Sequence, residues 1–189
     1  MLRESFCEPG RFIAMATAPR LTALLAVLAL VAAACGGATS SPEPSPGGAP
    51  SGTQAPEVSF EYFETGASGD LSDFEGKPTV LNFWASWCPA CIAEMPDFED
   101  HHVKFGDEVQ IIGVNTQDTR ERALRFVGET GVTYPIIEDL DDNMFSAFQG
   151  FGMPVTIFLN AEGEVVGRFD GGLFGDDIEA KMRELGLLG

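Results

Sequence analysis

The distribution of hydrophobic and polar residues divides the chain into three parts. Residues 21–34 form an apolar run that only Thr22 interrupts, residues 36–56 consist mostly of Gly, Ser, Pro, Ala and Thr, and from residue 57 onward short apolar segments alternate with polar ones. The middle part has almost nothing to bury, so we assign residues 35–56 to a flexible linker. The last part, residues 57–189, predicts one folded domain.

Strands and helices alternate in the predicted domain. Strands are expected over residues 58–63, 79–85, 109–114, 134–137, 155–159 and 164–169, the last as an edge strand that follows a hairpin turn at 161–163. Helices are expected over residues 89–105, 119–130, 141–149 and 176–185. This succession predicts an α/β fold in which a sheet is flanked by helices.

Two finer expectations concern single segments of this pattern. In the helix at 119–130, Leu124 and Val127 have the i, i+3 spacing of an inner face. Residues 66–70, which are rich in small and polar side chains, are expected only to turn the chain.

The apolar run near the N-terminus predicts export. Residues 21–34 are shorter than the roughly 20 apolar residues that a membrane-spanning helix needs, and they are typical of a signal-peptide core. We therefore assign residues 1–34 to a signal peptide. Glu4 and Glu8 are unlike the short, positive start of such peptides, so we take Met15 as the true start of the chain.

The end of this run, Ala32-Ala33-Ala34-Cys35, resembles the lipobox of bacterial lipoproteins. The resemblance implies cleavage before Cys35 and a lipid on its sulfur, which would anchor the chain at the extracytoplasmic face of the cell membrane. Ala32 stands where a typical lipobox has Leu or Val, and an ordinary secretory peptide that leaves Cys35 free remains an alternative. In either case the domain is exported.

The chain is strongly acidic. It contains 29 Asp and Glu against 11 Lys and Arg, and its formal net charge is -18 at pH 7. A surface of this charge repels the phosphates of nucleic acids and of anionic lipids. We therefore expect no nucleic-acid partner, and we expect the lipid rather than the domain surface to make the membrane contact.

A pair of cysteines carries the candidate chemistry. Cys88 and Cys91 lie between a predicted buried strand and the first turn of a predicted helix. Unpaired backbone NH groups and the positive end of the helix dipole favour a thiolate at Cys88 there, whereas Cys91 should be shielded and act as the resolving thiol. Pro89 suits the first helical turn and limits how the two sulfurs relax. The pair predicts disulfide exchange that needs no bound cofactor or metal.

Other roles of these residue types fit the sequence less well. A zinc site would need two further Cys or His ligands, and His101 and His102 lie toward the other end of the same helix, where we expect a solvated face. An inert structural disulfide is disfavoured because so short a loop removes little entropy from the unfolded chain. Residues 139–143 begin like a calcium loop but lack its glycine and its final glutamate, so we expect helix capping there.

The segment from Asn82 to Cys91 resembles the active-site stretch of thioredoxin-like proteins; its sequence is Asn-Phe-Trp-Ala-Ser-Trp-Cys-Pro-Ala-Cys. Pro96 stands where thioredoxins carry a kinking proline, and Gly152-Met153-Pro154 resembles their cis-proline loop. The chain looks most like the TlpA, ResA and DsbE group, because it has a hairpin before the first core strand and an added βα segment at 134–149. The resemblance implies a thioredoxin-like fold with a central mixed sheet, and a role outside the cytoplasm in cytochrome c maturation or disulfide formation.

The same resemblance implies roles for single residues. Glu94 stands where ResA-like proteins carry a functional acid, and Asn82 replaces the buried Asp that accepts protons in thioredoxin. Glu94 is therefore the candidate catalytic acceptor of the Cys91 proton, although an exposed position on the helix is an equal alternative. If Pro154 is cis, the backbone of Met153 faces the disulfide and pairs with a client, that is, a protein whose thiols or disulfide the chain exchanges.

Two tryptophans flank the cysteines. Trp84 is expected in the core, and Trp87 on an exposed apolar rim where, with Pro89, Met153 and Pro154, it binds the client. The expected clients are protein thiols and disulfides, with a membrane protein as a further electron donor or acceptor. A non-catalytic copper or haem-delivery chaperone is the rival function, and the motif leaves open whether the chain oxidises or reduces its clients.

Overall fold

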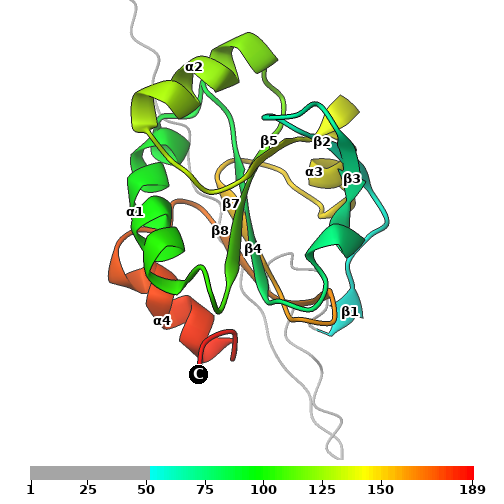
Figure 1. Cartoon of the computed structure of the whole chain (residues 1–189), viewed down its shortest axis with the longest axis vertical. Helices are drawn as coiled ribbons and strands as arrows, with labels where there is room; N and C mark the ends of the chain where they lie inside the picture. Colours follow the sequence, from blue (N-terminus) through cyan, green and yellow to red (C-terminus); the bar gives the residue numbers. More distant parts are fainter. Residues whose placement is uncertain (1–51) are drawn as a thin grey trace, which may run out of the picture. The chain divides into compact units, whose positions relative to one another are not determined.

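The computed structural model describes residues 52–189, so the expected signal peptide, Met15 and Cys35 lie outside the described part of the chain. The strands of this part form one sheet with the order β1-β8-β7-β4-β5-β6-β2-β3 (Figure 1). They are β1 Thr53–Gln54, β2 Ser59–Tyr62, β3 Ser68–Asp70, β4 Thr79–Trp84, β5 Gln110–Asn115, β6 Ile136–Glu138, β7 Val155–Leu159 and β8 Glu164–Asp170. The helices are η1 Leu71–Phe74, α1 Pro89–Phe105, α2 Arg120–Thr130, η2 Leu140–Asp142, α3 Asn143–Ala147 and α4 Asp176–Glu184.

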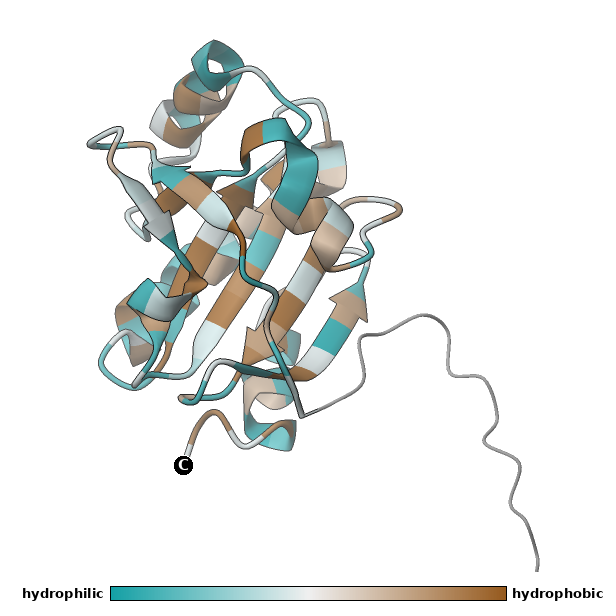
Figure 2. Ribbon diagram, turned by 90° about the vertical axis from the view of Figure 1, so that its right-hand side faces the viewer, coloured by the Kyte–Doolittle hydropathy of each residue, from teal (hydrophilic) through white to brown (hydrophobic). Residues whose placement is uncertain are grey.

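Strand β4 lies at the centre of the sheet and is covered on both faces. It pairs in parallel with β5 and antiparallel with β7, and all of its residues are buried. Val80 and Trp84 pack into the cluster beneath α1 and α4, whereas Leu81 and Phe83 pack into the cluster on the α3 side. Figure 2 shows the resulting hydrophobic bands on the central strands. The predicted α/β fold with a mixed sheet between helices is confirmed.

The edges of the sheet differ from the prediction. β1 pairs with β8 through Thr53 and Val165, so the folded domain begins before residue 57, inside the stretch that we assigned to the linker. β8 is therefore not an edge strand along its whole length. The side chains of β1 are exposed and carry no apolar pattern, because the strand is held by its backbone pairing and by the Gln54 amide, which donates hydrogen bonds to the carbonyls of Glu162 and Gly163. Likewise residues 68–70, expected as a turn, form β3 and complete the predicted hairpin with β2.

Helix boundaries were predicted better than helix faces. α1 has the predicted bounds, and α2 follows Thr119 and ends at Gly131, whose φ of 72° suits glycine. The predicted inner face of α2 was wrong for Leu124, which is 46% exposed, and right for Val127, which is partly buried against the core cluster. Ala123 is the fully buried residue of this helix. Which side of a helix is buried depends on the element that it meets, and helical spacing allows either Ala123 or Leu124 on the same face as Val127.

The segment expected as a helix at 141–149 is shorter than predicted. α3 begins at Asn143, and both Asp141 and Asp142 have φ of 57° in the left-handed region. Asp139, just before this turn, accepts hydrogen bonds from the backbone N–H groups of Met144 and Phe145 at 2.7 and 2.8 Å. A carboxylate therefore binds the first turn of α3, in agreement with the expected capping role of this acidic stretch.

Candidate active site

Four loops meet at one end of the central strands. The parallel strands β4 and β5 end there and lead into residues 85–88 and 116–119. β7 runs the other way and is preceded by residues 149–154, and β8, antiparallel to β7, leads into residues 171–175. Because adjacent strands fix this register, residues far apart in sequence come together around the end of β4.

The disulfide lies at the first turn of α1. Cys88 is the N-cap residue, its sulfur is bonded to that of Cys91 at 2.06 Å, and it accepts a hydrogen bond from the Cys91 N–H at 3.2 Å. Cys88 is 5% exposed and Cys91 is fully buried. The first-turn N–H groups and the helix dipole stabilise negative charge on the Cys88 sulfur after reduction.

The segment before Cys88 is fastened to the neighbouring loop. Asp118 accepts hydrogen bonds from the Ser86 N–H at 2.6 Å and from its hydroxyl at 2.8 Å, and the Trp87 indole N–H donates to the Gln117 carbonyl at 2.7 Å. Burial disfavours the charge of Asp118, but these bonds outweigh burial and lower its pKa. Trp87 is 52% exposed, as expected for a rim residue, and Trp84 is fully buried. Sequence reasoning missed Asp118, because its partner lies 32 residues away.

The proline loop lies beside the disulfide. The Met153–Pro154 peptide bond is cis, and Met153 packs against the cluster that contains Cys88 and Cys91. The Gly171 N–H donates to the Pro154 carbonyl at 2.9 Å. An open groove of ≈ 600 Å³ follows this loop and is lined by Phe151, Gly152, Met153, Pro154, Arg168, Asp170 and Gly171. An extended client segment has room to lie there.

Glu94 is buried one turn beyond Cys91 on α1. It has no exposed surface, and its two carboxylate oxygens accept hydrogen bonds from the Asn82 amide and from the Leu173 N–H, both at 2.8 Å. Burial raises its pKa to about 7, against the lowering effect of these two bonds. The alternative of an exposed Glu94 is therefore wrong. Leu173 was not predicted as a partner, since it is distant in sequence and contributes only a backbone group.

Two expectations about metals and histidines can be compared with the structure. His101 is 8% exposed and its Nδ1 lies 2.7 Å from the Asp97 carbonyl, so the expected solvated face at His101-His102 was wrong for the first of them. The ring packs near Phe105, which explains its burial. Within residues 52–189, no group of three or more His, Cys, Asp or Glu side chains is arranged to hold a metal ion.

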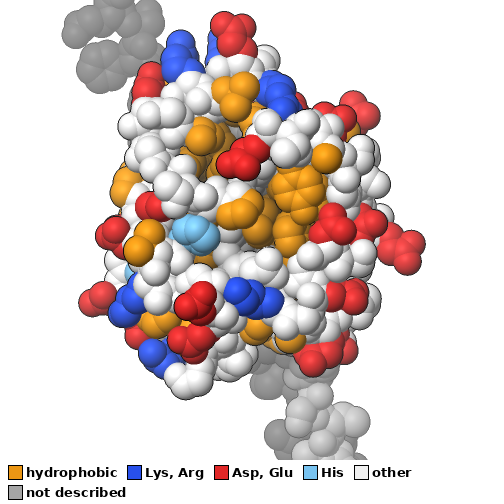
Figure 3. All heavy atoms as spheres, in the orientation of Figure 1, with side chains coloured by type: hydrophobic (Ala, Val, Ile, Leu, Met, Phe, Trp, Pro, Cys, Tyr) orange, Lys and Arg blue, Asp and Glu red, His pale blue; other side chains and the backbone are white. Residues whose placement is uncertain are grey.

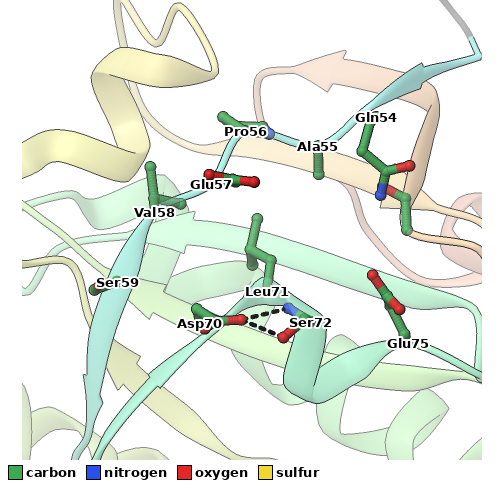
Figure 4. Close-up of a pocket in the computed structure, with 11 residues that line it drawn as sticks. Gln54, Ala55, Pro56, Glu57, Val58, Ser59, Asp70, Leu71, Ser72 and Glu75 are labelled. Atoms are coloured by element: carbon green, nitrogen blue, oxygen red, sulfur yellow. Dashed lines mark hydrogen bonds between the residues drawn. The ribbon is translucent and has the colours of Figure 1, made fainter.

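A second groove, of ≈ 610 Å³, lies between the β1–β2 connection and η1 (Figure 4). Asp70 caps η1 at its wall by accepting a hydrogen bond from the Ser72 N–H at 2.9 Å. None of the predicted site residues lines this groove, which is bordered by Gln54, Ala55, Pro56, Glu57, Val58, Ser59, Asp70, Leu71, Ser72, Glu75 and Gly163. It is therefore separate from the groove along the proline loop.

The structure combines a thioredoxin-like sheet, a CxxC disulfide at the first turn of the helix after the central strand, and a cis-proline loop next to that disulfide. This combination defines a thiol-disulfide oxidoreductase. The Redoxin family model matches residues 50–180, and the chain belongs to this family.

Individual relatives agree with this class. The chain is 36% identical over 132 residues to the thiol-disulfide oxidoreductase ResA of Halalkalibacterium halodurans, a match that covers 69% of this chain and 74% of the relative. It is 33% identical to ResA of Bacillus subtilis over 61% of this chain and 64% of that protein, which is less than two thirds of its length. Among solved structures, a secreted thiol-disulfide isomerase from Corynebacterium glutamicum has 27% identity and a TM-score of 0.62, over 70% of this chain and 84% of that one. The resemblance to ResA is thus confirmed.

Proposed function

We propose that this chain exchanges disulfides with proteins outside the cytoplasm through Cys88 and Cys91. The observation that carries the proposal is the disulfide itself, which caps α1 beside the cis Met153–Pro154 bond. Protein thiols and disulfides are the substrates that this class of enzyme implies. The secreted isomerase among its structural neighbours and the predicted signal peptide both support an extracytoplasmic location.

The proposed cycle uses two cysteines and one carboxylate. In the reducing direction, the Cys88 thiolate attacks a client disulfide, one client thiolate leaves, and a mixed disulfide forms. Cys91 then transfers its proton to the Glu94 carboxylate and attacks the Cys88 sulfur. The Cys88–Cys91 disulfide forms, the second client thiolate leaves, and the client has gained two electrons. In the oxidising direction the same steps run in reverse.

The proposed client contact is formed by the residues next to the disulfide. Trp87 and Pro89 are exposed beside Cys88, and the proline loop adds the half-buried Met153, which packs against the cysteine cluster, and the buried Pro154. In this proposal an extended client segment lies along the proline loop and pairs with the backbone of Met153, so that its cysteine reaches Cys88.

The direction of exchange is tested by the reduction potential of the Cys88–Cys91 couple. The full-length chain is equilibrated with defined glutathione or dithiothreitol buffers, and the Trp87 and Trp84 fluorescence reports the redox state. CxxC proteins span about -120 to -270 mV. A potential at or below roughly -250 mV would indicate a reductase that needs a membrane electron donor, as in haem-attachment pathways. A value of about -120 to -180 mV would indicate an oxidase instead, and the absence of any couple would contradict the proposed function.

Attachment to the membrane is proposed to depend on Cys35. Within residues 52–189 no helix is long and apolar enough to cross a bilayer. Replacing Cys35 with Ala removes the proposed lipidation site, so the protein is expected to move from the membrane fraction to the soluble exported fraction. Cell fractionation and labelling with a fatty acid measure this result. Unchanged membrane association of the Cys35→Ala variant would show that Cys35 carries no anchor.

A further inference from the structure

We propose that the surface around Cys88 selects client segments that carry lysine or arginine together with apolar residues near their cysteine. The inference rests on the proposed function and adds a preference among clients. It concerns the sheet end formed by residues 85–90, 116–119, 139–142, 149–154 and 170–177, which we call the disulfide end.

The disulfide end carries charge of one sign. Its residues include seven aspartates and no Lys or Arg, the aspartates being Asp118, Asp139, Asp141, Asp142, Asp170, Asp176 and Asp177. The strand register places these segments together, because β4, β5 and β6 end here, and β7 begins opposite the end of β8. A potential that is negative around a reactive sulfur attracts cations and repels anions.

Three of these aspartates are available to a client. Asp141, Asp176 and Asp177 are exposed, and their carboxylates have no hydrogen-bond or ion-pair partner in the described part of the chain. The others serve the fold: Asp118 holds Ser86, and Asp142 accepts hydrogen bonds from Thr116 and from the Gln117 N–H. The three exposed carboxylates are thus unpaired until a cationic partner reaches them.

Nearby cations do not neutralise the three exposed carboxylates. Arg168, whose side chain is 7% exposed, bonds Asp170 at 2.6 Å and the Phe148 carbonyl at 2.5 Å. Arg120 is bound to Glu138 and to the Phe63 carbonyl, and so is paired outside the disulfide end. Both guanidinium groups are therefore occupied.

Apolar anchors lie among the acids. Of the six large hydrophobic side chains that are exposed within residues 52–189, four belong to the disulfide end: Trp87 at 52%, Leu140 at 39%, Phe151 at 92% and Phe174 at 43%. Phe151 borders the groove along the proline loop, and Phe174 follows Leu173, whose N–H is bound by Glu94. Exposed aromatic rings next to an interface groove are typical anchors of a bound chain.

The combination of anchors and acids defines the partner by its chemistry. A segment with aromatic or aliphatic residues fills the groove, and its Lys or Arg side chains meet Asp141 on one side or Asp176 and Asp177 on the other. Acidic side chains also predominate on the face that Figure 3 shows. The test of the preference for cationic clients must therefore include the removal of an equal number of charges elsewhere on the protein.

The test compares two peptides that contain the same intramolecular disulfide and the same aromatic residues but differ in their flanking residues, Lys in one and Glu in the other. The reduced full-length chain reduces each peptide, and each rate is divided by the rate of dithiothreitol with the same peptide, which corrects for the intrinsic reactivity of the peptide thiols. At about 0.1 M salt we expect the corrected rate to be about tenfold higher for the Lys peptide. At about 1 M salt, where the Debye length is only about 3 Å, the two rates should converge.

Two triple variants locate the effect. The first triple variant removes three charges at the disulfide end and should lower the Lys-to-Glu rate ratio toward one; it is Asp141→Asn/Asp176→Asn/Asp177→Asn. The control triple variant is Asp107→Asn/Glu108→Gln/Glu162→Gln. It removes three exposed charges at the opposite ends of the strands, in the α1–β5 connection and the β7–β8 hairpin, and should keep the wild-type ratio. Because each ratio is taken within one protein, a general change in reactivity cancels.

The outcomes separate this inference from the proposed function. A wild-type ratio near one, or an equal fall of the ratio in both triple variants, overturns the charge preference while disulfide exchange stands. If the reduced wild-type chain reduces neither peptide and the oxidised chain oxidises neither peptide in its dithiol form, at any salt concentration, the proposed function itself fails.

Discussion

Replacing Cys91 with Ser is expected to stop turnover completely and to leave the protein covalently joined to its client. Cys88 is the more exposed cysteine and caps α1, so it should still form the mixed disulfide. The buried sulfur that normally breaks this bond is absent in the variant, and the intermediate therefore accumulates. Non-reducing electrophoresis of exported proteins, with and without dithiothreitol, measures the trapped complexes.

Matched variants make the assignment of roles specific. Cys88→Ser should trap no client, because Cys91 has no exposed surface. The double variant Cys88→Ser/Cys91→Ser gives the background from the two other cysteines of the chain, Cys7 and Cys35. If Cys88→Ser traps clients as well as Cys91→Ser does, the attacking and resolving roles are assigned the wrong way round.

Replacing Glu94 with Gln is expected to raise stability at pH 8 and leave it nearly unchanged at pH 4. In the folded chain burial raises the pKa of Glu94 from 4.5 to about 7. Between these values the folded state keeps a proton that the unfolded state has released, so this group lowers the free energy of unfolding as the pH rises. The contribution of Glu94 to the free energy of unfolding is intact below about pH 4.5 and lost above about pH 7, and the total loss is roughly 3 kcal/mol. Gln carries no charge, and the variant lacks this loss.

The local contacts allow this substitution. A Gln side chain places an NH₂ group, which can only donate, where one Glu94 oxygen accepts the hydrogen bond of the Asn82 amide in the wild type. The Asn82 Oδ1 atom is buried without a partner among residues 52–189, so a flip of the amide offers it to the new N–H donor. The variant is therefore expected to fold with the same sheet.

Urea unfolding of the oxidised protein at a series of pH values between 4 and 8 measures the effect. The control is Glu121→Gln on the exposed side of α2, which should retain the pH dependence of the wild type. If Glu94→Gln also retains it, Glu94 is not the group that releases its proton between these pH values.

The same variant tests the proposed role of Glu94 in exchange. Without the carboxylate, the variant lacks the proposed acceptor of the Cys91 proton during attack on the mixed disulfide, and general-base catalysis contributes about 10²- to 10⁴-fold in such steps. Release of the client should slow by about 10²-fold above pH 7, while the first attack by Cys88 keeps its rate. Stopped-flow measurement of the two phases separates these steps, and equal slowing of both would contradict the role.

The local sequence by itself determined the elements that carry the cysteines. Residues 79–85 and 89–105 were predicted as strand and helix, and the structure has β4 at Thr79–Trp84 and α1 at Pro89–Phe105. A continuous apolar run, a proline suited to a first turn and a CxxC spacing are all properties of neighbouring residues. The position of the disulfide at the start of a helix could therefore be predicted without knowledge of the rest of the chain.

The environment of the site was decided only by the tertiary structure. Glu94 is polar and occupies a helix position that sequence periodicity would allow either inside or outside, yet it is buried because Asn82 and the Leu173 N–H satisfy its oxygens. The Leu173 contact spans 79 residues, and the pairing of Thr53 with Val165 spans more than a hundred. Such contacts depend on which surfaces meet when the sheet and helices pack, and packing joins residues whose local sequences carry no common signal.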